Sequence, residues 1–252
     1  MIDQRLDGRV ALITGASKGL GRQMAGALAA AGAVVALVAR GGDSLEQARE
    51  EISRQGGKAY AFRGDVTSEA DVAAIASEVH RQVGAPDILI NNAGTNIRKP
   101  VHEYTLEEWR RVMSLNIDAP FLCTRAFVPG MIAKKHGRIL FISSAMGHVS
   151  QPHRTAYSTS KFAVRGITRA LALELAPYTI TANAISPGPF PTELTRVQLA
   201  DPSESAMLMS KIPLGRWGKL EELGALTVFL CSDASGFITG TDIIIDGGWT
   251  AH

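Results

Sequence analysis

The chain has 252 residues, 46% of them hydrophobic and 20% charged, and its formal net charge is +2. This composition is typical of a soluble globular protein with a sizeable core. So small a net charge disfavours nucleic acid and anionic membranes as partners. No apolar run approaches the ~18 residues of a membrane span, and the amino terminus lacks an apolar signal core. We therefore expect a cytoplasmic protein.

Metal and disulfide chemistry are both disfavoured. Cys123 and Cys231 lie within apolar runs, which predicts buried, reduced thiols. The six histidines are scattered without the spacing of metal ligands, so we predict no metal site.

Strand-like apolar runs alternate with helix-like segments along almost the whole chain. Predicted strands occupy residues 9–15, 33–40, 58–66, 86–94, 137–144, 179–188 and 240–248. Between them, an Ala-rich helix ends at Gly32, and Asp43 or Ser44 is expected to cap the next helix. Ser68 begins a later helix with a capping box. Within residues 105–136, the prolines at 120 and 129 predict breaks or helix starts.

The predicted strands are almost continuously apolar, which indicates burial on both faces of a sheet. Strands that alternate with helices predict parallel, right-handed βαβ units. The chain shows no linker, repeat or charge run. We therefore predict an α/β fold in which residues 1–252 form a single domain. It is a doubly wound, Rossmann-type, seven-stranded sheet with helices on both faces. The irregular stretch at about 187–218 is predicted to be a substrate loop.

The segment TGASKGLG (14–21) follows the first strand and begins the first helix. Gly15, Gly19 and Gly21 allow a tight turn and a close approach of backbone N–H groups to a pyrophosphate. An NAD site would place a carboxylate at the end of the second strand. This chain has Arg40 there instead, with Lys18 in the glycine loop, and both cations suit a 2′-phosphate. NADP(H) is the predicted cofactor, and NAD(H) stays as the alternative.

Four motifs occur in order: TGASKGLG, NNAG (91–94), Ser144 and YSTSK (157–161). With them the chain resembles the short-chain dehydrogenase/reductase family over essentially its whole length. The resemblance implies hydride transfer between a nicotinamide and a carbonyl or alcohol carbon. It implies these cofactor-binding residues: Gly15, Ser17, Lys18, Gly19, Leu20, Gly21, Arg40, Asp65, Val66, Asn92, Ala93, Gly94, Tyr157, Lys161, Pro187, Gly188, Phe190 and Thr192.

Ser144 lies 13 residues before Tyr157 and Asn116 lies 41 before it, a spacing that the family shares. Reducing a ketone requires a proton donor beside the carbonyl oxygen. We expect Tyr157 to be this acid/base and Lys161, one helical turn away, to lower its pKa from ~10. Ser144 is expected to hydrogen-bond the substrate oxygen. Asn116 is expected to order a water that relays protons through Lys161.

Two substrate classes compete within the resemblance. A polar hydroxy acid or sugar acid, as in gluconate 5-dehydrogenases, is favoured because Arg98 follows the NNAG loop and suits a carboxylate. Ser144 and His148 are further candidate substrate residues. His153 and Arg154 flank the tyrosine segment and are also candidates for polar contacts to a hydroxylated substrate, but we expect them to be solvated loop residues.

The alternative substrate is a 3-oxoacyl chain on acyl carrier protein, an acidic partner. The basic run 133–138 resembles part of a carrier-binding patch, but Tyr178 stands where carrier reductases have an arginine. An NADP-binding sensor or scaffold without activity is disfavoured because Tyr157 and Lys161 are both present. The resemblance also implies a homotetramer that packs helices at about 118–136 and 155–176 across a two-fold axis.

Overall fold

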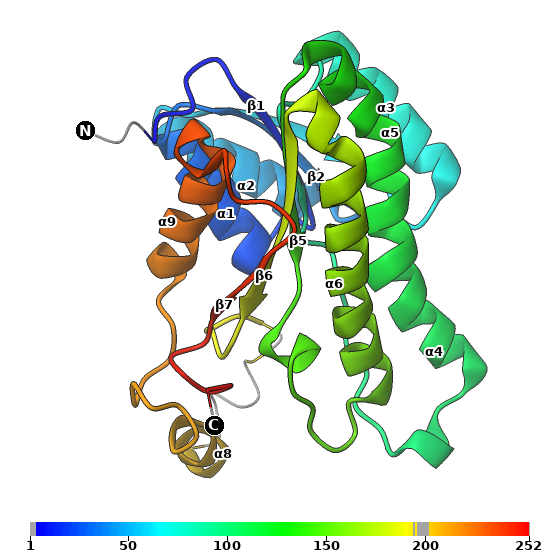
Figure 1. The fold of residues 1–252 in the computed structure, drawn as a ribbon, viewed down its shortest axis with the longest axis vertical. Coiled ribbons are helices and arrows are strands. Elements are labelled where there is room, and N and C mark those ends of the chain that lie inside the picture. The colour runs from blue at the N-terminus through cyan, green and yellow to red at the C-terminus, as the bar shows by residue number, and fades with distance from the viewer. Residues whose placement is uncertain (1–3, 194, 196–201, 252) are drawn as a thin grey trace.

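Seven parallel strands form one sheet in the order β3-β2-β1-β4-β5-β6-β7 (Figure 1). In this computed structural model, residues 4–193, 195 and 202–251 are described. The strands are β1 (Val10–Thr14), β2 (Val34–Ala39), β3 (Lys58–Arg63), β4 (Ile88–Asn91), β5 (Gly137–Ile142), β6 (Ile180–Pro187) and β7 (Asp242–Ile245). All seven coincide with the apolar runs that predicted them. The order reverses beside β1, which neighbours β2 on one side and β4 on the other.

Two layers of helices cover the sheet. Figure 1 shows α1, α2 and α9 on one side and α3, α5 and α6 on the other. The helices are α1 (Gly19–Ala30), α2 (Gly42–Arg54), α3 (Glu69–Gln82), α4 (Leu106–Met113), α5 (Ala119–Lys134), α6 (Thr155–Leu175), α8 (Pro202–Met209) and α9 (Leu220–Cys231). The predicted doubly wound α/β fold is confirmed.

Successive strand residues face opposite layers, as the strand period of two requires. On β1, Ala11 and Ile13 pack into the core beneath α1, α2 and α9, whereas Leu12 packs into the core beneath α3, α5 and α6. Every residue of β1, β4, β5 and β6 is buried. The edge strand β3 has exposed residues, including Lys58 and Tyr60.

Two local predictions were wrong. Helix α2 begins at Gly42 with Gly41 as its N-cap, and no side chain caps it. Asp43 instead lies in the first turn, where a carboxylate favours the positive end of the helix dipole. Pro129 does not interrupt α5. Both Pro129 and Arg125, whose carbonyl loses its helical partner, are exposed, so water can satisfy that carbonyl.

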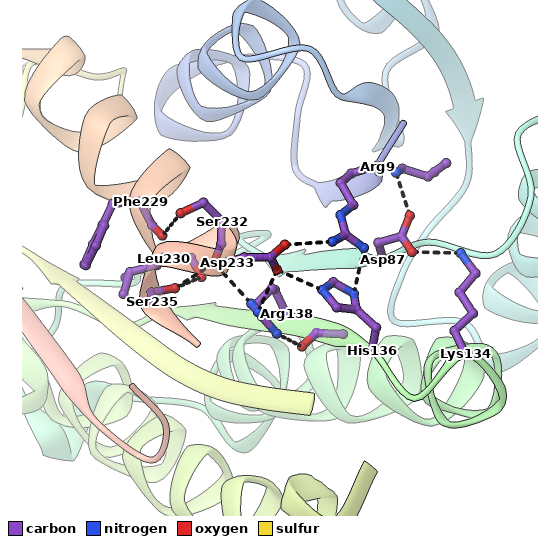
Figure 2. Close-up of polar contacts among 12 residues, drawn as sticks. Arg9, Asp87, Lys134, His136, Arg138, Phe229, Leu230, Ser232, Asp233 and Ser235 are labelled. Carbon is purple, nitrogen blue, oxygen red and sulfur yellow. Dashed lines mark hydrogen bonds and ion pairs between the residues drawn. The ribbon is translucent and has the colours of Figure 1, made fainter. Parts of the chain in front are cut away.

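A polar cluster ties the amino ends of the strands to the residues that follow α9 (Figure 2). Asp233, in the short helix η5 (Asp233–Ser235), accepts hydrogen bonds from Arg9 and Arg138 at 3.0 Å each. The His136 ring lies 3.3 Å from the same carboxylate. Beside this cluster, Lys134 donates to Asp87 at 2.9 Å.

Two cations of the basic run 133–138, Lys134 and Arg138, are bound to carboxylates in or beside this cluster. Arg138 is only 4% exposed, and both Lys134 and Arg138 have carboxylate partners. These residues lie at the amino ends of the strands, the opposite end of the sheet from the glycine loop that follows β1. Within the described ranges, no helix combines the length and hydropathy of a membrane span.

Candidate active site

A cavity of about 910 Å3 lies at the carboxyl ends of β1, β4, β5 and β6, beside the reversal in strand order. This is where open parallel sheets bind ligands. Every residue predicted to bind the nucleotide lines it. We call the part around the glycine loop and Arg40 the nucleotide end, and the part around Arg98, Ser144 and Tyr157 the substrate end.

The glycine loop is packed too closely for side chains. Gly15 has a φ of +65°, a conformation that favours glycine. A Cβ on Gly21 would lie 2.4 Å from the Gly15 carbonyl oxygen and 2.5 Å from Asn92 Nδ2. Asn92 in turn donates to the carbonyl oxygens of Thr14 and Gly15, at 2.8 and 3.2 Å. The start of α1 is therefore held directly against the loop that follows β4.

The amino end of α1 suits a phosphate. Its N-cap residue, Lys18, makes no side-chain capping bond, and the first turn carries no carboxylate. Gly19, Leu20 and Gly21, which form that turn, line the cavity. Uncapped N–H groups and the helix dipole together attract an anion, so these residues fit the pyrophosphate of a dinucleotide.

Thr14 is a structural residue of the site that sequence reasoning missed. Its Oγ1 accepts the backbone N–H groups of Asn92 and Ala93, at 3.0 Å each. It thereby fixes the NNAG loop against the end of β1. A buried threonine as the last residue of an apolar strand is the signal that could have found it.

The two cations predicted to meet a 2′-phosphate, Lys18 and Arg40, both lie at the nucleotide end. Arg40 follows β2 and forms an ion pair with Asp65 at 3.6 Å, with 72% of its side chain exposed. Lys18 pairs with Glu193 in the loop after β6. No carboxylate follows β2 directly, and the exposed Arg40 guanidinium has further N–H donors that suit a phosphate on the adenosine ribose at this point.

Tyr157 and Lys161 lie one turn apart near the amino end of α6, and both line the cavity. The Lys161 Nζ donates to the Ile142 carbonyl oxygen at 2.6 Å and lies 5.6 Å from the centre of the Tyr157 ring. Lys161 is 5% exposed, and burial lowers its pKa to about 8. Keeping Lys161 charged therefore costs free energy, because its buried ammonium group has lost its hydration.

The pKa of Tyr157 is raised because burial disfavours the phenolate. Three groups oppose this shift and lower the pKa: the Ser144 hydroxyl, then the charges of Arg154 and Arg98. The prediction that Lys161 lowers the pKa of Tyr157 was wrong, because the net shift is upward and the charges that oppose it are those of the two arginines. Here the guanidinium carbon of Arg154 lies 5.9 Å from the centre of the Tyr157 ring.

Asn116 lies in a π-helical turn, Ser114–Asp118, between α4 and α5. Its Oδ1 accepts from Thr95 N at 2.8 Å, and its Nδ2 donates to Thr95 O at 3.0 Å and to Ser160 Oγ at 2.9 Å. The side chain is 1% exposed and does not line the cavity. Asn116 therefore holds the loop after β4 against α6, and its relay of protons through water stays a prediction.

Ser144 lies two residues after β5 and is the N-cap of the short helix η3 (Ala145–Gly147). Its Oγ accepts from Met146 N at 3.1 Å, which leaves its hydroxyl proton for another partner. Ser144 and Tyr157 both line the substrate end.

The candidate substrate residues do not all line the cavity. Arg98 is exposed and lines the cavity. His148 does not line it, because its Nε2 lies 2.9 Å from Asp242 Oδ2 and 3.2 Å from Ser186 Oγ. Arg154 was expected to be solvated, but it is half-buried and lines the cavity.

The predicted substrate loop is described in part. Phe190 is 3% exposed and packs against Gly218, where a Cβ would lie 2.5 Å from its ring. Pro187, Gly188 and Thr192 line the cavity. The remaining part of this prediction, at residues 194 and 196–201, lies outside the described residues. No group of three metal-ligating side chains occurs in the described part of the chain.

A doubly wound sheet with a phosphate-binding glycine loop and a Tyr–Lys pair in one cavity defines the class of nucleotide-dependent oxidoreductases. Comparison with known proteins agrees. A family model described as Enoyl-(Acyl carrier protein) reductase matches residues 15–250. The chain belongs to the short-chain dehydrogenase/reductase family, as the motifs predicted. It is an oxidoreductase of that family.

Three similar proteins illustrate the range of relatives. Gluconate 5-dehydrogenase of Gluconobacter oxydans is 37% identical over 97% of this chain and 96% of its own. A 3-oxoacyl-[acyl-carrier-protein] reductase of Aquifex aeolicus is 36% identical over 97% and 98%. The crystal structure of a gluconate 5-dehydrogenase from Burkholderia cenocepacia, in complex with NADP and tartrate, matches with a TM-score of 0.95 and 37% identity, over 99% and 98%.

Proposed function

We propose that this protein is an NADP(H)-dependent oxidoreductase that interconverts a secondary alcohol and a ketone on a polar hydroxy acid or sugar acid. The observation that carries the substrate class is Arg98. It lines the substrate end and makes no ion pair with any described carboxylate. A guanidinium so placed suits the carboxylate of a substrate. Relatives named for gluconate 5-dehydrogenase activity support the same class.

The cofactor proposal rests on the nucleotide end. Gly15 and Gly21 allow the close approach that a pyrophosphate needs, and the uncapped start of α1 supplies N–H donors. Arg40 and Lys18 supply positive charge for a 2′-phosphate. Several structural neighbours were crystallised with NADP. NAD(H) remains the alternative.

When bound, the nicotinamide supplies or accepts the hydride. In the reduction, we propose that Tyr157 gives its phenolic proton to the carbonyl oxygen, while Ser144 donates a hydrogen bond to the same oxygen. Because burial raises the pKa of Tyr157, the phenol is protonated at neutral pH, as a proton donor must be. In the alcohol oxidation, Tyr157 accepts the proton. Lys161 and the Asn116-held loop position the surrounding backbone.

The acyl-carrier alternative is weakened by the polar cluster in Figure 2. Lys134 and Arg138, which resembled part of a carrier-binding patch, are paired with Asp87 and Asp233. They also lie at the opposite end of the sheet from the cavity. An acidic carrier that docks beside the substrate end would not meet them.

A substrate panel tests the proposal. We expect the protein to oxidise gluconate with NADP+ and to reduce 5-ketogluconate with NADPH. Acetoacetyl thioesters with NADPH, and each substrate with NAD(H), are the comparison arms. Activity confined to the thioester would reverse the substrate assignment, and a preference for NADH would reverse the cofactor assignment.

We also propose that the protein is a cytoplasmic homotetramer. Helices α5 and α6 carry exposed apolar side chains, with Phe121 50%, Phe162 45% and Leu173 81% exposed. Such side chains suit burial against another copy. Both cysteines, Cys123 and Cys231, are free and buried, in keeping with a reducing compartment. Light scattering should give a tetramer mass, and cell fractionation should recover the protein with cytoplasmic markers; a monomer mass would contradict the assembly.

A further inference from the structure

Charge is distributed unevenly along the cavity. Six lysine and arginine side chains and two carboxylates line it, a net formal charge of +4. Each cation at the nucleotide end has a carboxylate partner: Lys18 with Glu193, Arg22 with Glu51 and Arg40 with Asp65. Arg98 and Arg154 line the substrate end of the same cavity. Neither of these two arginines forms an ion pair with a described carboxylate. The substrate end therefore attracts an anion.

Arg154 is placed by the turn that begins α6. His153, just before it, has a φ of +65°, which is uncommon for a residue with a side chain and turns the chain abruptly. Arg154 then follows as the N-cap residue of α6, three residues before Tyr157. Its guanidinium lies over the Tyr157 ring, 5.9 Å from the ring centre. The strained turn thus sets a cation directly beside the proton donor.

The two arginines are also neighbours of each other. Burial lowers the pKa of Arg154, and the positive charge of Arg98 lowers it further. Two neighbouring guanidinium groups, of which Arg154 is half-buried, repel one another and bind an anion that lies between them more strongly than either would alone. A carboxylate has enough lone pairs to accept hydrogen bonds from both.

A third group at the substrate end lacks a partner. Asn96 lines the cavity two residues before Arg98. Its Oδ1 is cut off from solvent and accepts no hydrogen bond from the described residues. A buried acceptor without a donor costs free energy, which a hydroxyl group of a ligand would recover.

We propose that Arg98 and Arg154 jointly bind the carboxylate of the substrate and that Asn96 Oδ1 accepts a hydrogen bond from one of its hydroxyl groups. Arg154 is then the residue that selects hydroxy carboxylates over neutral alcohols. This inference rests on the proposed function for its chemistry, and it adds two specificity residues to it. It also links substrate charge to catalysis, since the arginines that bind the carboxylate lower the pKa of Tyr157.

Tartrate is the probe, because it carries carboxylates and hydroxyl groups. Isothermal titration at low ionic strength would compare the wild type with Arg154→Gln and Arg54→Gln. We expect Arg154→Gln to weaken tartrate binding about 10- to 100-fold, the loss of a charge-assisted hydrogen bond. Arg54→Gln is the matched control, because Arg54 is exposed in the last turn of α2 and does not line the cavity, and it should change binding less than about twofold. The opposite pattern, equal losses, or no binding to the wild type would overturn the inference.

Succinate isolates the role of Asn96, because it is tartrate without the hydroxyl groups. We expect the wild type to bind tartrate more tightly than succinate, and Asn96→Ala to remove this preference. A preference that survives Asn96→Ala would overturn that part of the inference.

The Arg154→Lys variant keeps the positive charge but loses the planar guanidinium with its paired N–H donors, so we expect tartrate binding between that of the wild type and that of Arg154→Gln. A purely structural Arg154 would instead lower the melting temperature without changing tartrate selectivity.

The kinetics distinguish this inference from the proposed function. If the wild type oxidises gluconate, Arg154→Gln should raise KM for gluconate at least tenfold. It should also move the acidic limb of the pH profile for this oxidation to higher pH, because Tyr157 must be deprotonated to accept the proton and a cation that lowers its pKa is lost. An unchanged KM and pH profile would refute the role of Arg154. If the wild type acts on no hydroxy acid, the proposed function fails, and the tartrate titrations still decide the anion site.

Discussion

The burial of Lys161 makes the stability of the protein depend on pH in the alkaline range. Lys161 is 5% exposed, and burial lowers its pKa from 10.5 to about 8. Between these two values, the unfolded chain holds a proton that the folded protein has released. The free energy of unfolding therefore rises with pH in this window. Below about pH 8, both states are protonated, and the folded protein carries the full cost of a buried ammonium.

The size of this effect follows from the two pKa values. The full difference corresponds to roughly 3 kcal/mol, of which roughly 2 kcal/mol falls between pH 7.5 and 10. Lys161→Met removes the titrating group and leaves the Ile142 carbonyl without its donor. The loss of that hydrogen bond does not depend on pH, so it cancels when differences at two pH values are compared.

Urea unfolding at several pH values between 7.5 and 10 measures the effect. The wild type should gain stability relative to Lys161→Met by roughly 2 kcal/mol across this range. Lys58→Met is the control, because it removes an exposed lysine on β3 and should leave the difference flat. A wild-type advantage over Lys161→Met that stays constant with pH would refute the reasoning, and one that falls would reverse its sign.

Three further predictions concern catalysis, cofactor choice and the polar cluster. Tyr157→Phe should lower kcat by about 10²–10⁴-fold without changing NADPH affinity in a fluorescence titration; retained turnover would contradict the proton-donor role. Arg40→Leu should lower kcat/KM for NADPH about 10- to 100-fold, because it removes a charge-assisted hydrogen bond to the 2′-phosphate, and should leave kcat/KM for NADH nearly unchanged. The control variant Arg54→Leu, in the last turn of α2, should alter neither value. Asp233→Asn should destabilise the protein at pH 7 by about 1–3 kcal/mol, because it leaves the buried Arg138 without a carboxylate, and the loss should shrink as the pH falls through the lowered pKa of Asp233.

The pKa of Asp233 gives that last prediction its sign. Burial raises the pKa, but the hydrogen bond from His136 and the charges of Arg9 and Arg138 outweigh burial and lower it. A carboxyl group with a lowered pKa stabilises the folded state above its unfolded pKa, and this stabilisation is lost in acid. The pKa of His136 is also lowered, mainly by burial, so protonation of His136 opposes folding in the same direction. Chemical denaturation of the wild type and Asp233→Asn between pH 3 and 7 would test both; a stability difference that grows in acid would contradict them.

The sheet was predictable because its signal is local. The central strands are buried on both faces, so each appears in the sequence as an unbroken apolar run. The glycine loop was also predictable, because close backbone contact at Gly21 leaves no room for any other residue. Both features depend on residue types within a few positions of one another.

Charge pairing was not predictable, because the partners are distant in sequence. The basic run 133–138 looked like a docking patch, yet Arg138 meets a carboxylate 95 residues away and Lys134 meets one 47 residues away. Two predictions about substrate residues were also wrong. His148 was a candidate substrate residue and Arg154 was expected to be solvated, but Arg154 lines the cavity and His148 does not. His148 lies close to Tyr157 in sequence, but Asp242, 94 residues later, draws it away from the cavity. Arg154 enters the cavity through the turn at His153, which a sequence pattern does not reveal.

The pattern of pairing argues for what the substrate end does. Where this chain buries a cation for structural reasons, as at Arg138, it supplies a carboxylate for it. At the substrate end it buries Lys161 with only a carbonyl oxygen as partner and leaves Arg98 and Arg154 without any described carboxylate. Such cations destabilise the fold, and functional sites are where proteins tolerate this loss. At the substrate end the missing negative charge must then come from the ligand, so a bound carboxylate should stabilise the protein against unfolding by an amount set by its concentration and affinity.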